Sequence, residues 1–191
     1  MIMNSLFSLT FPWAADPTIN TIAMVIGAIS VVLVVSSYAM KNRLTIVITG
    51  LIARALAIVQ YAMMGKIEGM VLNAVGVLCF ELARRRETLS KPWRIAAYVF
   101  SNAIAVAVSV ATYVSPISLL PLFGLLFHVN GAWRKRAMSV RLVTLPGCPL
   151  WFAYNFISGT YASCVGDALS FAIIVASLIK YDVLDKRKKQ A

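Results

Sequence analysis

Seven long apolar segments, separated by short polar turns, restrict the fold of this chain more than any other feature. Each is close to the roughly 20 residues that an α-helix needs to cross the hydrocarbon core of a bilayer. Hydrophobic residues make up 60% of the chain and charged residues only 13%, too little polar surface to cover a globule in water. We therefore predict an all-α, polytopic membrane protein with transmembrane helices at residues 21–40, 44–64, 68–83, 95–114, 117–133, 140–156 and 161–180.

The basic residues indicate how these helices are oriented. All Lys and Arg residues except Arg54 and Lys66 lie near the turns after the first, third and fifth segments, or at the C-terminal end. Cytoplasmic loops of membrane proteins carry the excess of Lys and Arg, so we expect the N-terminus outside and the C-terminus in the cytoplasm. Topology thus accounts for the net charge of +11, and we do not expect nucleic acid as a partner.

Two parts of the chain repeat the same order of features at a shift of about 93 residues. Each has an apolar segment, a basic turn, a segment ending near a tyrosine, a glycine turn and a segment with an early polar residue. The matching pairs are Tyr61 and Tyr154, then, after one inserted residue, Gly65 and Gly159, and Asn73 and Asp167.

Because one further segment lies between the copies, both copies have the same orientation in the membrane. Transporters whose site lies between two bundles use such parallel repeats. The predicted units are an interfacial leader at 1–20, a first three-helix bundle at 21–86, a linker helix at 92–114, a second three-helix bundle at 117–181 and a basic cytoplasmic tail at 182–191. Phe11 and Trp13 of the leader are expected at headgroup depth.

Several motifs resemble those of the YgjV family of bacterial inner membrane proteins. They are the run PISLLPLFG at 116–124, the basic turn WRKR at 133–136, Arg141, the stretch 151–159, the triplet LNA at 72–74 and the acidic Asp167. The resemblance covers most of residues 27–181 and implies a multi-pass protein of the bacterial inner membrane. The predicted plan is also similar to the PnuC vitamin transporters and the SWEET sugar transporters, although this chain lacks the Pro-Gln pair of the wider PQ-loop group.

Three polar residues inside the apolar segments are candidates for a solute site. Arg54 lies near the membrane midplane, where an arginine costs about 2.5–3.5 kcal/mol and needs a partner or water. Asp167 lies on a helix face that also carries serines, and Asn73 lies on the equivalent face of the third segment. These polar side chains either flank a solute or make interhelical hydrogen bonds. We further hypothesise that Arg54 and Asp167 form an intramembrane ion pair, or exchange it with solute.

Four more side chains complete the candidate set. His128, the only histidine, suits either a proton relay or a hydrogen-bonded structural role. Trp151, Tyr154 and Asn155 either stack on and hydrogen-bond a ring-shaped solute, or form an aromatic belt at the outer surface.

Local features predict further details of packing. Pro146 and Pro149 leave backbone groups of the sixth segment unpaired and predict a kink there. Glu81 is expected to pair with Arg85, one helical turn later. The cysteines are expected to be free thiols that pack as small apolar residues, at positions 79, 148 and 164.

Nothing in the sequence indicates an enzyme, a cofactor or a metal site, because no catalytic triad, metal-ligand spacing, P-loop or pair of carboxylates on one helix is found. The leading hypothesis is a permease for a small polar or aromatic metabolite that works by alternating access. The alternative is a membrane scaffold or assembly partner that transports nothing. The expected partners are the lipid bilayer and a small solute, and self-association into a homo-oligomer stays open.

Overall fold

The computed structural model describes residues 16–113 and 115–184, which form eight α-helices with short 3-10 and π segments and contain no β-strand. The predicted all-α fold is confirmed. The helices are α2 (Pro17–Ala39), α3 (Arg43–Met63), α4 (Ile67–Arg84), α5 (Lys91–Ala111), α6 (Leu119–Ala132), α7 (Ala137–Thr144), α8 (Gly147–Ile157) and α9 (Tyr161–Ser177). The 3-10 segments are Arg85–Glu87 and Pro116–Ser118, and a π-helix, Leu178–Leu184, continues α9.

Several helices have the length and composition of membrane spans. Four stretches of the described chain are long and apolar enough to cross a bilayer: Pro17–Ala39, Arg43–Met63, Lys91–Ala111 and Ser163–Tyr181. Large apolar side chains also point outward from them, such as Val32, which is 65% exposed, and Val110, which is 64% exposed. An apolar exterior of this kind fits a protein surrounded by lipid.

Helix α2 begins earlier than the sequence predicted. The Asp16 carboxylate accepts a hydrogen bond from the backbone N–H of Thr18 at 2.7 Å, and Pro17 occupies the first helical position, where its missing N–H costs nothing. Residues 17–20 of the predicted interfacial leader therefore belong to the helix. The rest of the leader, including Phe11 and Trp13, and residues 185–191 of the predicted tail lie outside the described residues.

The predicted sixth segment is two helices rather than one. Helix α7 ends at Thr144 and α8 begins at Gly147, so the chain is interrupted at the Leu145–Pro146 step. Neither Pro146 nor Pro149 has a backbone N–H to continue the helical ladder, and the Leu145 carbonyl accepts instead from the N–H of Cys148, at 3.3 Å. The kink predicted from the prolines is confirmed, and it is a complete helix break.

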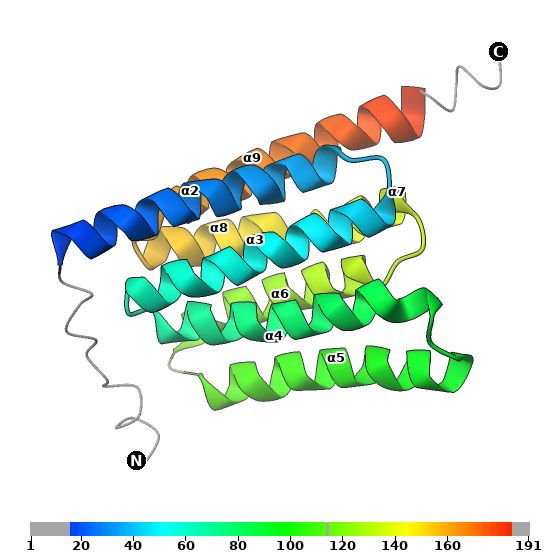
Figure 1. Cartoon of the computed structure of the whole chain (residues 1–191), viewed down its shortest axis with the longest axis horizontal. Coiled ribbons are helices and arrows are strands. Elements are labelled where there is room, and N and C mark those ends of the chain that lie inside the picture. The colour runs from blue at the N-terminus through cyan, green and yellow to red at the C-terminus, as the bar shows by residue number, and fades with distance from the viewer. Residues whose placement is uncertain (1–15, 114, 185–191) are drawn as a thin grey trace.

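The helices close into a ring (Figure 1). Packing runs from α2 to α3, α4, α6, α8 and α9, and α9 packs back on α2. Helix α5 lies outside this ring against α4 and α6. In the orientation of Figure 1, α2, α3, α4 and α5 form a front row and α9, α8 and α6 lie behind it. The centre of the ring is therefore enclosed by six helices.

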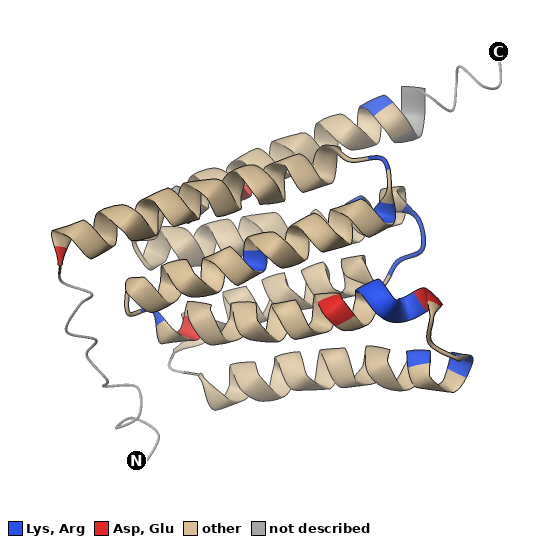
Figure 2. Cartoon of the chain, in the orientation of Figure 1, with Lys and Arg blue, Asp and Glu red and all other residues tan. Residues whose placement is uncertain are grey.

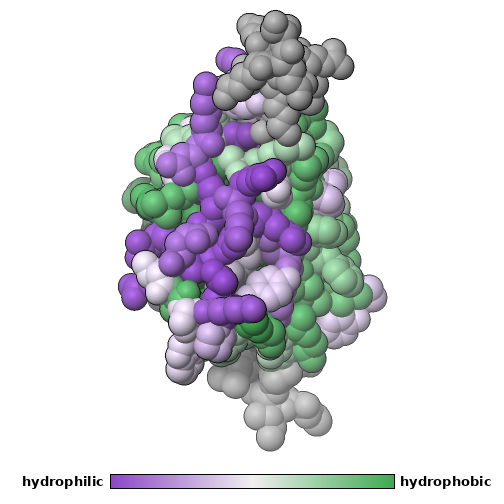
Figure 3. Space-filling view, turned by 90° about the vertical axis from the view of Figure 1, so that its right-hand side faces the viewer, coloured by the Kyte–Doolittle hydropathy of each residue, from purple (hydrophilic) through white to green (hydrophobic). Residues whose placement is uncertain are grey.

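Lys and Arg gather at one end of the molecule, where α2, α4 and α6 end (Figure 2). Viewed onto this end, hydrophilic residues cover the middle and hydrophobic residues flank them (Figure 3). We call this the basic end. It has the charge pattern that the sequence predicted for the loops on one side of the membrane.

Three arginines at the basic end tie helix ends together, and we call Arg43, Arg86 and Arg141 the arginine clasp. Arg43 donates hydrogen bonds to the carbonyls of Ala132 and Arg134, at and just beyond the end of α6, at 2.9 and 2.7 Å. Conversely, Arg141 donates to two backbone carbonyls at the end of α2, at 2.9 and 2.5 Å. Arg86 donates to the carbonyl of the residue directly after α6, at 2.7 Å. The clasp thus satisfies carbonyls that helix ends leave unpaired.

Candidate functional site

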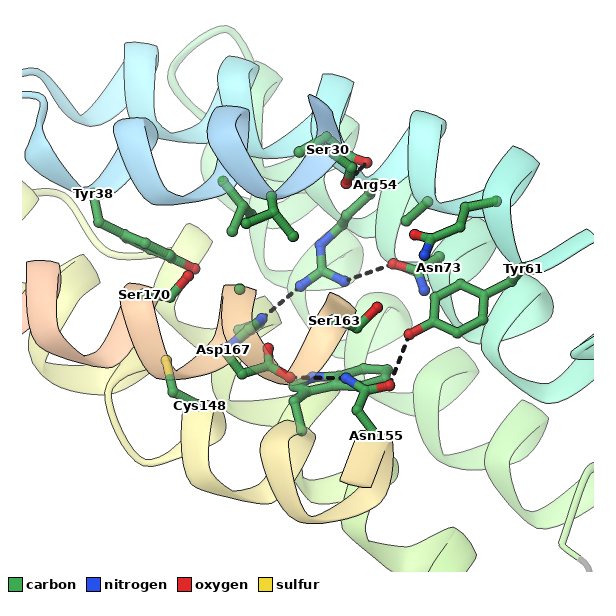
Figure 4. Close-up of a pocket in the computed structure, with 18 residues that line it drawn as sticks. Ser30, Tyr38, Arg54, Tyr61, Asn73, Cys148, Asn155, Ser163, Asp167 and Ser170 are labelled. Carbon is green, nitrogen blue, oxygen red and sulfur yellow. Dashed lines mark hydrogen bonds between the residues drawn. The ribbon is translucent and has the colours of Figure 1, made fainter. Parts of the chain in front are cut away.

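A polar cavity of about 90 Å³ lies in the middle of the ring (Figure 4). Side chains from all six ring helices line it, and the volume is enough for several water molecules. The predicted candidates that line the cavity are Arg54, Asn73, His128, Trp151, Asn155 and Asp167. Residues from both halves of the chain therefore meet at one site.

Arg54 is held in the wall of the cavity by contacts from α4 and α6. Its side chain is only 8% exposed. Nη2 lies 2.6 Å from His128 Nδ1, and Nη1 donates to Asn73 Oδ1 over a longer 3.4 Å. The guanidinium also lies over the Phe80 ring, 4.7 Å from its centroid, and a Cβ at Gly76 would come within 3.0 Å of the Arg54 side chain. The site is thus shaped around a cation at this position.

The contact with Arg54 determines the state of His128. A guanidinium has only donors, so Nδ1 must accept, and the imidazole is neutral with its proton on Nε2. That Nε2–H is buried and has no hydrogen-bond partner in the described part of the chain. His128 therefore has the hydrogen-bonded structural role that the sequence allowed, and its second ring nitrogen is a donor that remains unused.

The opposite wall is organised by Asn155. Its amide Nδ2 donates to Asp167 Oδ2 at 2.8 Å, and its Oδ1 accepts from the Tyr61 hydroxyl at 2.9 Å and from the Thr160 hydroxyl at 2.8 Å. The network joins α3, α8 and α9. It fixes the Asp167 carboxylate at the cavity through a neutral donor rather than through a cation.

Arg54 and Asp167 line the same cavity but do not form the direct ion pair that was hypothesised. In the described ranges, no carboxylate lies within the 4.0 Å ion-pair distance of Arg54, and Asp167 has no basic group within it. The physical reason is that other partners hold each group, His128 and Asn73 on one wall and Asn155 on the other.

Trp151 and Tyr154 of α8 do not lie at the outer surface, so the belt alternative is wrong for these two residues. Trp151 and Tyr154 are only 5% and 6% exposed, because α8 turns them into the ring. Trp151 lines the cavity, whereas Tyr154 does not. Tyr154 instead packs edge-to-face against Trp151 at 5.9 Å and donates to Glu68 Oε2 at 3.1 Å.

Sequence reasoning missed part of the site. Tyr38, Ser30 and Gln60 also line the cavity. Gln60, a polar residue inside an apolar segment, carried a signal of the same kind as Asn73, whereas Tyr38 looked like an ordinary residue of the membrane interface. Outside the cavity, Glu68 Oε1 is buried without a hydrogen-bond partner in the described residues.

Two smaller predictions are confirmed outside the cavity. Glu81 pairs with Arg85 at 2.6 Å, as expected, and with Arg84 at 2.6 Å as well. The cysteines are free and buried, at positions 79, 148 and 164.

An apolar helical exterior around a polar, charged interior defines the class: this is an α-helical membrane protein. The chain belongs to the Imp-YgjV family of bacterial inner membrane proteins, because the model of that family matches residues 21–184. The family and the inner-membrane location expected from the motifs are thereby confirmed. Neither the curated proteins nor the solved structures contain a significant match to the chain.

Proposed function

We propose that this protein is a permease for a small polar metabolite, with seven membrane crossings arranged as two three-helix bundles. The first bundle is α2 to α4, the second is α6 to α9 with α7 and α8 counted as one crossing, and α5 is the linker. The observation that carries the proposal is the cavity between the bundles, to which one contributes the buried Arg54 and the other the partly buried Asp167.

The cost of these charges favours transport over a scaffold. A charged side chain inside a membrane protein is expensive and is retained where it serves a pathway or a ligand. The interhelical hydrogen bonds expected of a packing role are present, from Arg54 to His128 and Asn73 and from Asn155 to Asp167. Each charge nevertheless also lines an open space without an oppositely charged partner in the described residues. A solute site explains this arrangement.

The turns that precede α4 and α9 support a repeat. Gly65 and Gly159 have left-handed backbones, with φ of 66° and 73°. Each turn closes with a hydrogen bond back over five residues, from Lys66 to Tyr61 at 2.8 Å and from Thr160 to Asn155 at 2.9 Å. In the two turns, Tyr61 and Asn155 hold equivalent positions. The sequence comparison had instead paired Tyr61 with Tyr154, one residue earlier.

The ring also provides interfaces along which two bundles could rock. The third helix of each bundle packs on the first helix of the other, α4 on α6 and α9 on α2. At the basic end, which we assign to the cytoplasm, Arg43 and Arg141 link the bundles in both directions. Alternating access with an opening at the cytoplasmic end requires these bonds to break.

Transport can be tested without knowing the solute. The purified full-length protein is reconstituted into liposomes, incubated with an isotope-labelled extract of small bacterial metabolites, and the vesicle contents are measured by mass spectrometry. At least one metabolite should accumulate with the wild type and fall by about tenfold or more with Arg54→Gln or Asp167→Asn, since each variant removes a charge from the site.

A matched control is Glu81→Gln, which removes a carboxylate that lies outside the cavity and pairs with Arg84 and Arg85. It should leave uptake near the wild-type level. If no metabolite distinguishes wild-type vesicles from empty ones, the permease assignment is wrong and a scaffold role is favoured.

A further inference from the structure

Several hydrogen-bonding groups around the cavity have no partner among the described residues. They are His128 Nε2, Trp151 Nε1 and Ser170 Oγ, each buried. The two ring N–H groups can only donate, since His128 carries its proton on Nε2. The N–H edge of His128 lies beside Gly147 and that of Trp151 beside Gly124, where α6 packs on α8. Buried donors without acceptors cost free energy, so polar groups around this cavity remain available to a ligand or water that reaches them.

Arg54 adds a positive charge on the wall that carries His128. Arg54 has five N–H donors, and its hydrogen bonds to His128 and Asn73 use two of them. With only 8% of its surface exposed, Arg54 is 92% buried. A guanidinium with free donors is the side chain best suited to a carboxylate, which it can bind with two parallel hydrogen bonds. This wall therefore favours an anionic group.

Asp167 provides the opposite charge across the cavity (Figure 4). One of its oxygens accepts from Asn155, and the other accepts no hydrogen bond from the described residues. Val31, Val34 and Ala57 add apolar surface to the lining. The site thus offers a cation, an anion and a short apolar stretch within about 90 Å³.

We propose that the cavity binds a small zwitterion, with its carboxylate at Arg54 and its ammonium group at Asp167. The inference builds on the permease function proposed above and names the chemical class of its solute. A ligand with one charge would leave either Arg54 or Asp167 without a counter-charge, whereas a zwitterion compensates both. The volume restricts the class to short molecules.

Binding can be measured directly by calorimetry on the full-length protein in lipid nanodiscs. The probes are glycine, L-alanine, β-alanine and γ-aminobutyrate, which vary the distance between the charges, with propionate and propylamine as single-charge analogues. At least one zwitterion should bind about tenfold or more tightly than both analogues, because each end adds a charge-assisted hydrogen bond.

The variants assign each end of the ligand. Arg54→Gln should weaken zwitterion binding by about ten- to a hundredfold and abolish any propionate binding, while Asp167→Asn should do the same for the zwitterion and propylamine. Trp151→Phe keeps an aromatic side chain, although a smaller one, and removes the N–H, and should weaken zwitterion binding about two- to tenfold. The matched control is Trp133→Phe, since Trp133 Nε1 is also buried without a partner in the described residues but lies outside this cavity.

The zwitterion assignment fails if no zwitterionic probe binds at about 10 mM, where a ligand with a Kd of about 1 mM would be nearly saturated. It also fails if a bound zwitterion is unaffected by Arg54→Gln and Asp167→Asn. Vesicle uptake separates it from the permease proposal. Uptake of a solute that is not zwitterionic would overturn the assignment and leave the permease, whereas zwitterion binding with no uptake of any metabolite would support the assignment and overturn the permease.

Discussion

The two ring nitrogens of His128 have different surroundings. His128 has Arg54 on one ring nitrogen and, in the described residues, no partner for the N–H on the other, so its position stabilises a buried cation and leaves one donor unused. Small residues make room for this arrangement. A Cβ at Gly147 would come within 2.7 Å of the imidazole. The histidine and the glycine are therefore parts of the same packing solution.

At the residue scale, we predict that the hydrogen-bond acceptor of His128 contributes more to the stability of the protein than its ring does. His128→Leu removes the acceptor for Arg54 and should lower the free energy of unfolding by about 1–3 kcal/mol, because it leaves a buried charged donor without a partner. His128→Asn places an amide oxygen near Nδ1 and should lose less. Thermal unfolding of the purified variants checks this, and a leucine variant as stable as the asparagine variant would contradict it.

At the element scale, the clasp and the helix break explain how the ends of helices are satisfied inside a membrane protein. The last carbonyls of α2 and α6 have no intrahelical partners, and water is scarce near lipid, so Arg141 and Arg43 serve as donors. Because the helix is interrupted at Pro146, Arg141 lies on the short helix α7 rather than on one long helix. Residues that looked merely topogenic in the sequence are structural.

We predict that Arg141→Lys is destabilising although it conserves charge. Arg141 is 1% exposed and donates through Nε and Nη2 to two carbonyls, a geometry that a lysine ammonium does not reproduce. The free energy of unfolding should fall by about 1–3 kcal/mol in a denaturant titration. Arg136→Lys, at an exposed position of the same basic end, is the control and should change stability by less than about 0.5 kcal/mol. Equal effects of the two substitutions would contradict a specific role for Arg141.

At the scale of the whole molecule, the basic end and the apolar exterior orient the protein in its membrane. The turn that contains Lys66 lies at one end of the helix bundle, and the turn that contains Lys135 lies at the other end. The positive-inside rule assigns the second turn to the cytoplasm. The seven crossings that we propose then place the N-terminus outside.

This topology predicts which positions a membrane-impermeant thiol reagent reaches in intact cells. With alanine at the buried native cysteines, Lys66→Cys should be labelled from outside, and Lys135→Cys only after the membrane is permeabilised. Both positions are exposed, so access depends on the side of the membrane and not on burial. Labelling of Lys135→Cys in intact cells, with Lys66→Cys protected, would reverse the assignment.

The sequence alone determined the helical membrane class, the family, a kink at the prolines of the sixth segment and six of the residues that line the cavity. Hydrophobicity, charge and proline act locally, so their effects can be predicted from runs and spacings. It could also predict the Glu81 pair, because its partners lie within one helical turn.

Only the tertiary structure decided which polar groups meet. The contact of Arg54 with His128 spans 74 residues and that of Tyr61 with Asn155 spans 94, so each depends on the closure of the ring. The same closure buried Trp151 and kept Arg54 and Asp167 apart on two walls. A helix pattern shows which face is polar, but the partner across that face is set by packing between distant helices.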